Sequence, residues 1–297
     1  MKIDEPPSRP AATYDEALAR VAAMKKLDDA SILPIAYTTL HDHGKPADLC
    51  VVLLHGFTNH PGQYRELAPQ LFERGHNVLI PRLPEQGDRN RMTKRMAKLT
   101  ASALLATASE AVDIAQGLGR RVVVLGISTS GLLCAYFAQF RADITRSIPV
   151  NAVFSMLHMR QPVNNAVARA LLLLPNFFMW WDPRHKEDEL PRSGYPRFPT
   201  HALAQALRIG ELVEGSAKSE AMAAKSVVMV TNERDPAVNN KVNDQVTDLW
   251  RKRAPQRVEA YRFTSLPVNH DIIDPENLYP RVDIVYPKLI ELIEAAP

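Results

Sequence analysis

The stretch RVVVLGISTSGLL, residues 121–133, decides the fold class. It begins with an apolar, β-branched run typical of a buried strand, and from Gly131 onward it reads as an apolar helix. Between the two, Ser128 has a small residue two positions away on each side, Gly126 and Ser130. A serine on a sharp turn from strand to helix needs small residues there, because the two backbones approach closely. The stretch therefore predicts a strand–turn–helix unit with the hydroxyl of Ser128 at the turn.

Other interpretations of this stretch compete with that one. Gly126 and Gly131 have the spacing of a phosphate-binding loop, but Leu132 stands where such a loop needs lysine. A dinucleotide-binding fingerprint also fails, since Gly-x-Gly occurs only at Gly117 and Gly119, before a strand instead of after one. An ordinary glycine–serine turn without a catalytic role stays open on this motif alone.

On both sides of this unit, short β-like runs alternate with helical ones. Strands are expected at residues 35–40, 50–54, 77–80, 121–125, 147–156, 226–230 and 258–263. Helices are expected at residues 13–27, 63–74, 99–116, 131–140, 239–252 and 286–295. This alternation is typical of a mostly parallel sheet with helices on both faces, so the predicted fold class is α/β.

The alternation stops between residues 157 and 222, where no strand is expected and prolines are frequent. Because this segment is apolar, we interpret it as a cap or lid insertion and not as a linker. The expected organisation is an N-terminal helix and first strand region at 1–48, a core at 49–156 and 223–297, and the cap at 157–222.

A second motif, LLHGFTNHPGQ at residues 53–63, follows an earlier strand and precedes a helix. Acyl transfer needs two backbone N–H groups aimed at the developing oxyanion, and a His-Gly loop after a strand is a common source of one of them. We expect the N–H groups of Phe57 and Thr129 to form this oxyanion hole.

A nucleophilic serine also needs a base and an orienting acid. His270 follows the strand at 258–263 by a short loop, and Asp235 follows the strand at 226–230, so both belong to the carboxyl edge of the sheet. An acid after the preceding strand is an alternative arrangement, but residues 151–160 contain no carboxylate. Glu233 is a weaker competitor for the acid. The expected catalytic residues are Ser128, Asp235 and His270.

Composition excludes several classes of protein. In the 297 residues the formal net charge is only +3 and both signs are interspersed, so no nucleic-acid partner is expected. Two cysteines are too few for a disulfide framework or a cysteine zinc site. No signal peptide is visible, and residues 170–181 are too short and interrupted for a membrane span, so we expect a cytoplasmic protein without stable membrane insertion. The sequence leaves the oligomeric state open.

The chain resembles the α/β-hydrolase superfamily over residues 50–294, and within it bacterial carboxylesterases, monoacylglycerol-lipase-like hydrolases and serine-aminopeptidase-like hydrolases. The resemblance rests on LLHGF, PRLPEQG, GISTSG, NERDP and NHDII. It implies a Ser-His-Asp hydrolase without a cofactor. Two residues depart from the family pattern: Ser130 replaces the second glycine of the elbow, and Asn269 stands where a glycine often precedes the histidine.

The expected activity is hydrolysis of small-molecule carboxylic esters through an acyl-enzyme, with lipophilic acyl or aryl esters favoured by the apolar cap. Amide or peptide hydrolysis stays open, because Glu187, Asp188 and Glu189 could hold a substrate amine. A non-catalytic binding protein of the same fold is the third alternative. Residues that could line the substrate pocket are His60, Phe177, Phe178, Trp180 and Trp181.

Overall fold

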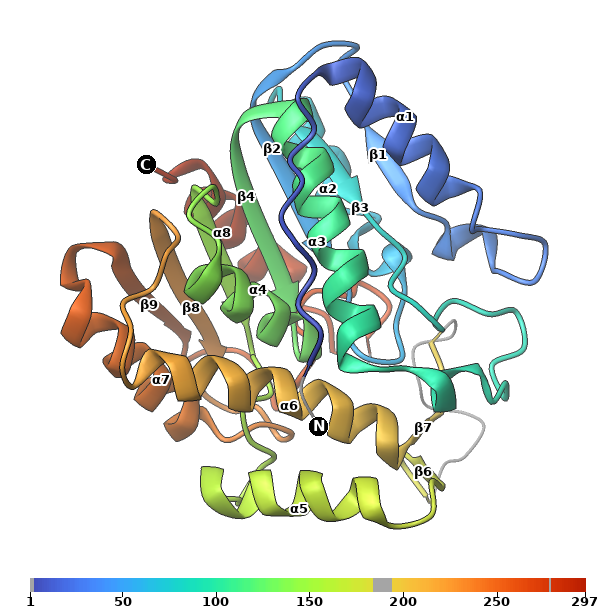
Figure 1. Ribbon diagram of the computed structural model, residues 1–297, viewed down its shortest axis with the longest axis vertical. Helices are drawn as coiled ribbons and strands as arrows, with labels where there is room; N and C mark the ends of the chain where they lie inside the picture. Colours follow the sequence, from blue (N-terminus) through green and yellow to red (C-terminus); the bar gives the residue numbers. More distant parts are fainter. Residues whose placement is uncertain (1–2, 184–193, 278) are drawn as a thin grey trace.

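The computed structural model describes residues 3–183, 194–277 and 279–297. Figure 1 shows a central twisted sheet between layers of helices. Within the described residues, seven strands form this sheet in the order β1-β3-β2-β4-β5-β8-β9. β1 pairs antiparallel with β3, and all other neighbouring strands run parallel. The strands span Thr39–His41 (β1), Ala47–Leu54 (β2), Asn77–Ile80 (β3), Gly119–Ile127 (β4), Arg146–Val150 (β5), Ser226–Asn232 (β8) and Val258–Phe263 (β9).

Successive residues of β2 point to two separate hydrophobic cores. Cys50, Val52 and Leu54 belong to the core on one face of the sheet, which includes residues of α1, α3, α4, α6 and α7. Leu49, Val51 and Leu53 belong to the core on the other face, formed with α2 and α8. Because side chains alternate along a strand, a run that is apolar at every position needs a cover on both faces. The helices span Tyr14–Lys25 (α1), Leu67–Glu73 (α2), Ala101–Leu118 (α3), Thr129–Phe140 (α4), Thr200–Ala217 (α6), Asn240–Arg253 (α7) and Val282–Glu294 (α8).

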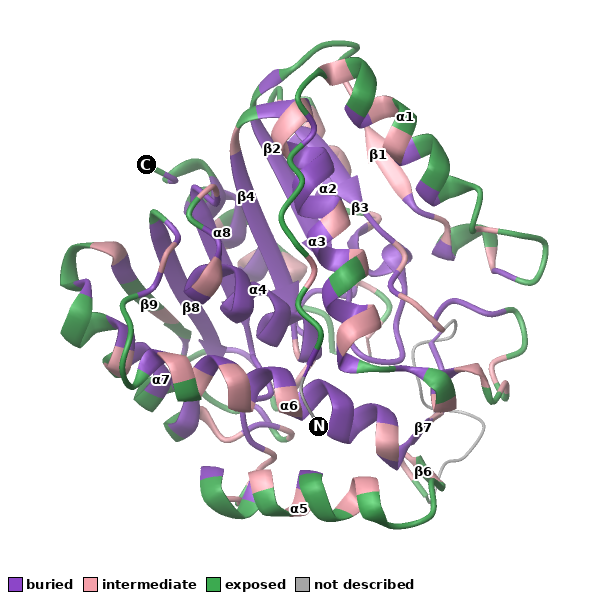
Figure 2. Cartoon of the chain, viewed as in Figure 1, coloured by how far each residue is buried: buried purple, intermediate pink, exposed green. Residues whose placement is uncertain are grey.

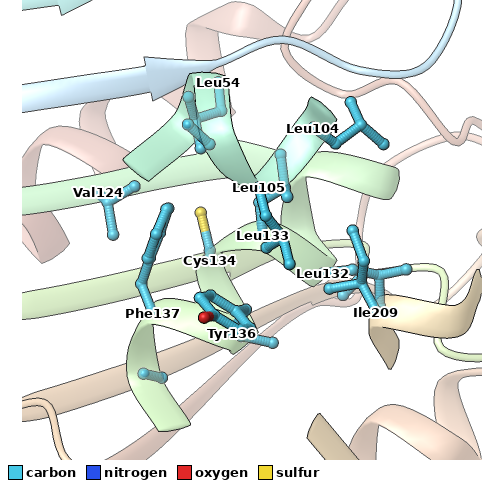
Figure 3. Close-up of a cluster of buried hydrophobic side chains, with 14 of the residues drawn as sticks. Leu54, Leu104, Leu105, Val124, Leu132, Leu133, Cys134, Tyr136, Phe137 and Ile209 are labelled. Atoms are coloured by element: carbon cyan, nitrogen blue, oxygen red, sulfur yellow. The ribbon is translucent and has the colours of Figure 1, made fainter. Parts of the chain in front are cut away.

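Helix α4 is the best-covered helix of the fold. Residues 129–139 of this helix are all buried, and Figure 3 shows Leu132, Leu133 and Phe137 among side chains from α3, β2, β4 and α6. A helix that is apolar all round has to be surrounded on all sides. The turn that leads into α4 therefore rests on rigid elements.

The segment between β5 and β8 contains α5 (Gln161–Leu173), β6 (Phe178–Trp180), β7 (Arg197–Pro199) and α6. α6 is largely buried against α4, whereas α5 packs on α6 through a narrow face and is exposed elsewhere (Figure 2). The expectation of no strand in this segment is wrong, because β6 and β7 form a two-stranded antiparallel sheet. Each strand has three residues, which is too short for a recognisable alternation of polar and apolar positions.

Several further boundaries differ from the sequence prediction, and three of them involve a turn. The expected strand at 35–40 begins instead as a 3₁₀ turn at Pro34–Ala36, and pairing starts only at Thr39. The expected strand at 147–156 ends at Val150, because Asn151 turns the backbone to a φ of 42°. The expected helix at 63–74 is divided into a 3₁₀ turn at Pro61–Tyr64 and α2. Two more 3₁₀ turns, at Arg95–Lys98 and Pro255–Arg257, complete the described helical turns.

Within the described residues, no helix combines the length and the apolar character needed to cross a lipid bilayer.

Candidate active site

Ser128 lies on a strained turn at the carboxyl end of β4. Its φ is 62° and its ψ −118°, a region that residues other than glycine rarely adopt, and α4 begins at the next residue. The N–H of Ser128 donates to the carbonyl oxygen of Val150, 2.9 Å away, which ties the turn to β5. Surrounding structure has to maintain such a conformation, because it costs about 1–3 kcal/mol relative to a relaxed one.

The glycines at 126 and 131 are both required by close backbone contacts. A Cβ on Gly126 would lie 2.6 Å from the carbonyl oxygen of Ser130, and a Cβ on Gly131 would lie 2.8 Å from the Cα of Ala152. Ser130 fits at the second small position because Gly126 leaves room for its Cβ. Its hydroxyl donates a short hydrogen bond to the carbonyl oxygen of His55, so this departure from the family pattern links the turn to the His-Gly loop.

His55 sets the orientation of the peptide that joins Gly56 to Phe57. Burial lowers the pKa of His55 to about 3, so its ring is neutral. Nε2 accepts from the N–H of Leu83 at 3.0 Å, which leaves the proton on Nδ1 to donate to the carbonyl oxygen of Gly56 at 3.1 Å. In a trans peptide the N–H points opposite to the C=O, so the N–H of Phe57 points away from the His55 ring. Within the described residues this N–H has no acceptor.

The N–H of Thr129 is the second expected donor. Thr129 is the first residue of α4, and the first N–H groups of a helix have no acceptor within the helix. These groups lie at the positive end of the helix dipole, where an anion is stabilised. Within the described part of the chain the N–H of Thr129, like that of Phe57, has no acceptor, so both expected donors remain unpaired.

His270 and Asp235 lie side by side, with Nδ1 of His270 2.7 Å from Oδ2 of Asp235. The other carboxylate oxygen of Asp235 accepts from the N–H groups of Ala237 and Val238, and its side chain is fully buried. Glu233, the competing acid, is exposed. Burial lowers the pKa of His270, but the charge of Asp235, its hydrogen bond and the charge of Asp271 together outweigh that effect, so the pKa is raised. The arrangement favours a protonated imidazole more strongly than water does.

Side-chain amides hold the loop that carries His270. Asn151, at the end of β5, donates from Nδ2 to the carbonyl oxygen of His270 at 2.8 Å and accepts at Oδ1 from the N–H of Asn232 at 2.7 Å. Asn232, the last residue of β8, donates to the carbonyl oxygens of Pro267 and Asn269. The side chain of Asn269 accepts from Asn277. Asn151 and Asn232 were not predicted from the sequence, because nothing in the residue pattern marks an amide at a strand end as functional.

Ser128 and His270 line one cavity of about 360 Å³ in the described part of the chain. Phe57 and Trp181 line it too, and Tyr195, Val268 and Tyr279 are lining residues that the sequence analysis did not single out. Other residues in its wall are Gly56, Thr58, Asn59, Gln63, Ile127, Gly194, Pro236, Asn269, Asp271 and Asn277.

The remaining expected pocket residues are not among those that line this cavity. His60 is buried as the N-cap of the 3₁₀ turn that follows the His-Gly loop, and its Nδ1 accepts from the N–H of Gly62. Burial lowers the pKa of His60 to about 4. Phe178 and Trp180 face the guanidinium of Arg197 across the β6–β7 pair, and Phe177 is half exposed. Strand alternation accounts for Phe178 and Trp180, which share one face of β6, whereas Trp181 follows the strand and lines the cavity.

The fold and this cavity at the carboxyl edge of the sheet are those of an α/β hydrolase. A family model described as the alpha/beta hydrolase family matches residues 51–276, and the chain belongs to that family. This confirms the predicted α/β-hydrolase fold.

Particular relatives include a thermostable monoacylglycerol lipase of Bacillus sp. (strain H-257), which is 26% identical over 183 residues, or 62% of this chain and 69% of the lipase. Among solved structures, one reported for the metagenome-derived lipolytic enzymes LipS and LipT aligns with a TM-score of 0.65 at 20% identity, covering 89% of this chain and 99% of the other. The monoacylglycerol lipase of Paleococcus ferrophilus aligns with a TM-score of 0.64 at 16% identity, covering 88% and 99%. These structures share the fold of this chain.

Proposed function

We propose that this protein is a serine hydrolase that cleaves carboxylic esters through an acyl-enzyme. The observation that carries the proposal is the shared cavity: Ser128, on its strained turn, lines it together with His270, whose Nδ1 is 2.7 Å from Asp235. Two relatives named above, one similar in sequence and one in structure, are monoacylglycerol lipases, which is in keeping with an ester substrate.

In the proposed mechanism, Nε2 of His270 accepts the proton of the Ser128 hydroxyl as its oxygen attacks the ester carbonyl carbon. Asp235 holds the proton on Nδ1 and balances the charge of the imidazolium. The N–H groups of Phe57 and Thr129 bind the oxyanion. The imidazolium then protonates the leaving alkoxide, and the same histidine activates water to release the acid from Ser128.

The substrate class that we propose is an ester with a lipophilic acyl or aryl group. Phe57, Ile127, Trp181, Tyr195 and Val268 give the cavity an apolar wall. We further propose that residues 157–222 act as a cap, since Trp181, Gly194 and Tyr195 come from this segment. Trp181 donates from Nε1 to Oγ1 of Thr58 at 2.9 Å, and the N–H of Tyr195 donates to the carbonyl oxygen of Thr58, so both contact the loop that carries Phe57.

Amide hydrolysis has less support. Glu187, Asp188 and Glu189, the residues that left it open, lie outside the described residues. Asp271 is an acid in the cavity wall, but its two oxygens already accept from Gln63, Asn59 and two backbone N–H groups. A carboxylate whose acceptor sites are occupied is a poor partner for a substrate amine.

The test is hydrolysis of p-nitrophenyl esters of increasing acyl length, with an aminoacyl p-nitroanilide alongside. We expect the parent to cleave esters, and we expect Ser128→Ala to lose at least about 10⁴-fold in kcat with its thermal unfolding preserved. A fluorophosphonate should label the parent at Ser128 and leave the alanine variant unlabelled. A parent that cleaves no ester and takes no label would overturn the proposal and favour the binding-protein alternative.

A further inference from the structure

The two peptides on either side of Gly56 are held at three of their four polar groups. In the peptide between His55 and Gly56, the carbonyl oxygen accepts from the hydroxyl of Ser130 and the N–H donates to Oε1 of Gln63 at 2.8 Å. In the next peptide, the carbonyl oxygen of Gly56 accepts from the His55 ring and from the N–H of Asn59. The remaining group is the N–H of Phe57, the expected oxyanion donor. Its direction is therefore set by its neighbours before any substrate binds.

Gln63 connects this loop to the loop that carries His270. Its Nε2 donates to Oδ2 of Asp271 at 2.6 Å, and Asp271 directly follows His270. The polarity of the amide is fixed at both ends, because the N–H of Gly56 needs an acceptor and the carboxylate of Asp271 needs a donor. Gln63 is buried, at 1% exposure, so water cannot replace either bond freely.

Asp271 is itself fixed by its loop. Its Oδ1 accepts from the N–H groups of Ile273 and Asp274, and its Oδ2 also accepts from Nδ2 of Asn59. A shift of the His270 loop would therefore move the group that holds Gln63, and Gln63 would move the peptide ahead of Phe57.

We propose that Gln63 is a positioning residue that couples the oxyanion loop to the His270 loop, through hydrogen bonds to Gly56 and Asp271. The inference rests on the proposed function, because it concerns the donor and the base of that reaction. Under this proposal Gln63 and Asp271 fix the geometry of the transition state and do not contribute to substrate binding. Loss of either bond should lower kcat and leave KM nearly unchanged.

The test is a double-variant cycle that reverses the direction of the hydrogen bond between positions 63 and 271. Asn59 loses its 3.3 Å bond to Asp271 in the asparagine variants but keeps its 3.2 Å bond to Asp274. Asp271→Asn places an amide N–H against the N–H of Gln63, and Gln63→Glu places two carboxylates against each other. Each single variant should lose roughly 10–100-fold in kcat, since misplacing a catalytic group by about 1 Å costs on that order. In the double variant, the carboxylate introduced at position 63 can accept both from the N–H of Gly56 and from the amide introduced at position 271. We therefore expect kcat to return to within about fivefold of the parent. The assays are run near pH 9, well above the usual carboxyl range, so that the paired carboxylates of Gln63→Glu share a proton as little as possible.

Two controls keep the outcome readable. Gln70→Glu makes the same charge change at an exposed position of α2 and should change kcat by less than about twofold, as expected for a surface site. Gln63→Asn introduces no charge and is one methylene too short to reach both partners, so it should lower kcat even if the charged variants do not fold.

Losses that multiply in the double variant would overturn the coupling, as would single variants that raise KM at constant kcat. The same double-variant cycle can be measured without an ester, as the rate at which a fluorophosphonate labels Ser128 in each variant. A parent that cleaves and labels while the cycle shows no rescue refutes only the role of Gln63. A parent that neither cleaves nor labels refutes the proposed function itself.

Discussion

The two sides of the proposed site are built with different residue types. On the side of Ser128, Gly126 and Gly131 let backbone segments approach more closely than a residue with a Cβ would allow. On the side of His270 there is no glycine, since none follows Gly215 in the sequence. Asn151 and Asn232 hold that side through hydrogen bonds to backbone carbonyl oxygens.

The difference follows from what each side has to position. The turn at Ser128 has to bring a strand, a helix and the neighbouring β5 together, and only a missing side chain provides that space. The loops of Asp235 and His270 have no such contact to make, but their backbone carbonyl groups need donors because they lie next to buried strand ends. An asparagine there satisfies two groups at once.

Among the substitutions that compare the two sides of the site, Gly126→Ala has the largest expected effect. Its Cβ would lie 2.6 Å from a backbone oxygen, so the Ser128 turn has to shift. We expect a loss of more than about 100-fold in kcat and of about 1–3 kcal/mol in the free energy of unfolding, as for other overpacked sites. Ester hydrolysis and urea unfolding measure the two effects.

Gly215→Ala is the matched control for that substitution. Gly215 is exposed within α6 and has no atom within 4 Å of an added Cβ. The alanine should leave kcat unchanged and stabilise the protein by up to about 1 kcal/mol through helix propensity. If Gly126→Ala behaves like Gly215→Ala, the elbow is not under the steric constraint described above.

A smaller effect on kcat is expected on the other side of the site, from Asn151→Gly. Glycine keeps the φ of 42° without strain but removes both side-chain hydrogen bonds. We expect a loss of roughly 10-fold in kcat from the freed His270 loop and of about 2–3 kcal/mol in stability from the unpaired groups. Ester hydrolysis and urea unfolding again measure the two effects.

Asn151→Ala separates strain from hydrogen bonding. It removes the same bonds as the glycine variant but also places a Cβ at positive φ, which costs about 1–2 kcal/mol more. Equal unfolding free energies for the two variants would show that the backbone at 151 relaxes. Parental activity in both would show that the asparagine does not hold His270.

The side of the site around Ser128 was predicted from the sequence better than the side around His270, for physical reasons. The spacing of Gly126, Ser128 and Gly131 is a local pattern, and the constraint that it reflects lies within a few residues. The hydrogen bonds of Asn151 join residues up to 119 positions apart, so no local pattern carries them. The same limit explains why Gln63 was not singled out, since its partner Asp271 is 208 positions away.

Strands were predictable where turns or polar residues mark both ends, and unpredictable where the strand has only three residues. β3 and β9 have the expected boundaries, Asn77–Ile80 and Val258–Phe263, because each is bounded by polar residues or turns. The three-residue strands β6 and β7 have too few positions for alternation to be seen.

The last prediction compares how the two sides of the site lower the stability of the protein. Burial, with the charge of Asp271, raises the pKa of Asp274 from 3.8 to about 6. A carboxyl with a raised pKa keeps its proton longer in the folded state, so the folded state loses stability as the pH rises from about 4 to about 6. Asp274→Asn removes this loss, and the stability of the variant relative to the parent should increase across that range and level off above it. Two pKa units set an upper limit of about 3 kcal/mol.

Ser128→Gly is the variant on the other side of the site to be compared with Asp274→Asn. It relieves the strain at a φ of 62° and should stabilise the protein by about 1 kcal/mol by the same amount at every pH, because no charge changes. Urea unfolding of both variants between about pH 4 and about pH 8 measures the contrast. A gain from Asp274→Asn that stays constant over this range would mean that Asp274 titrates alike in the folded and unfolded chain. Any loss of stability on the side of His270 would then be independent of pH, as it is at the Ser128 turn.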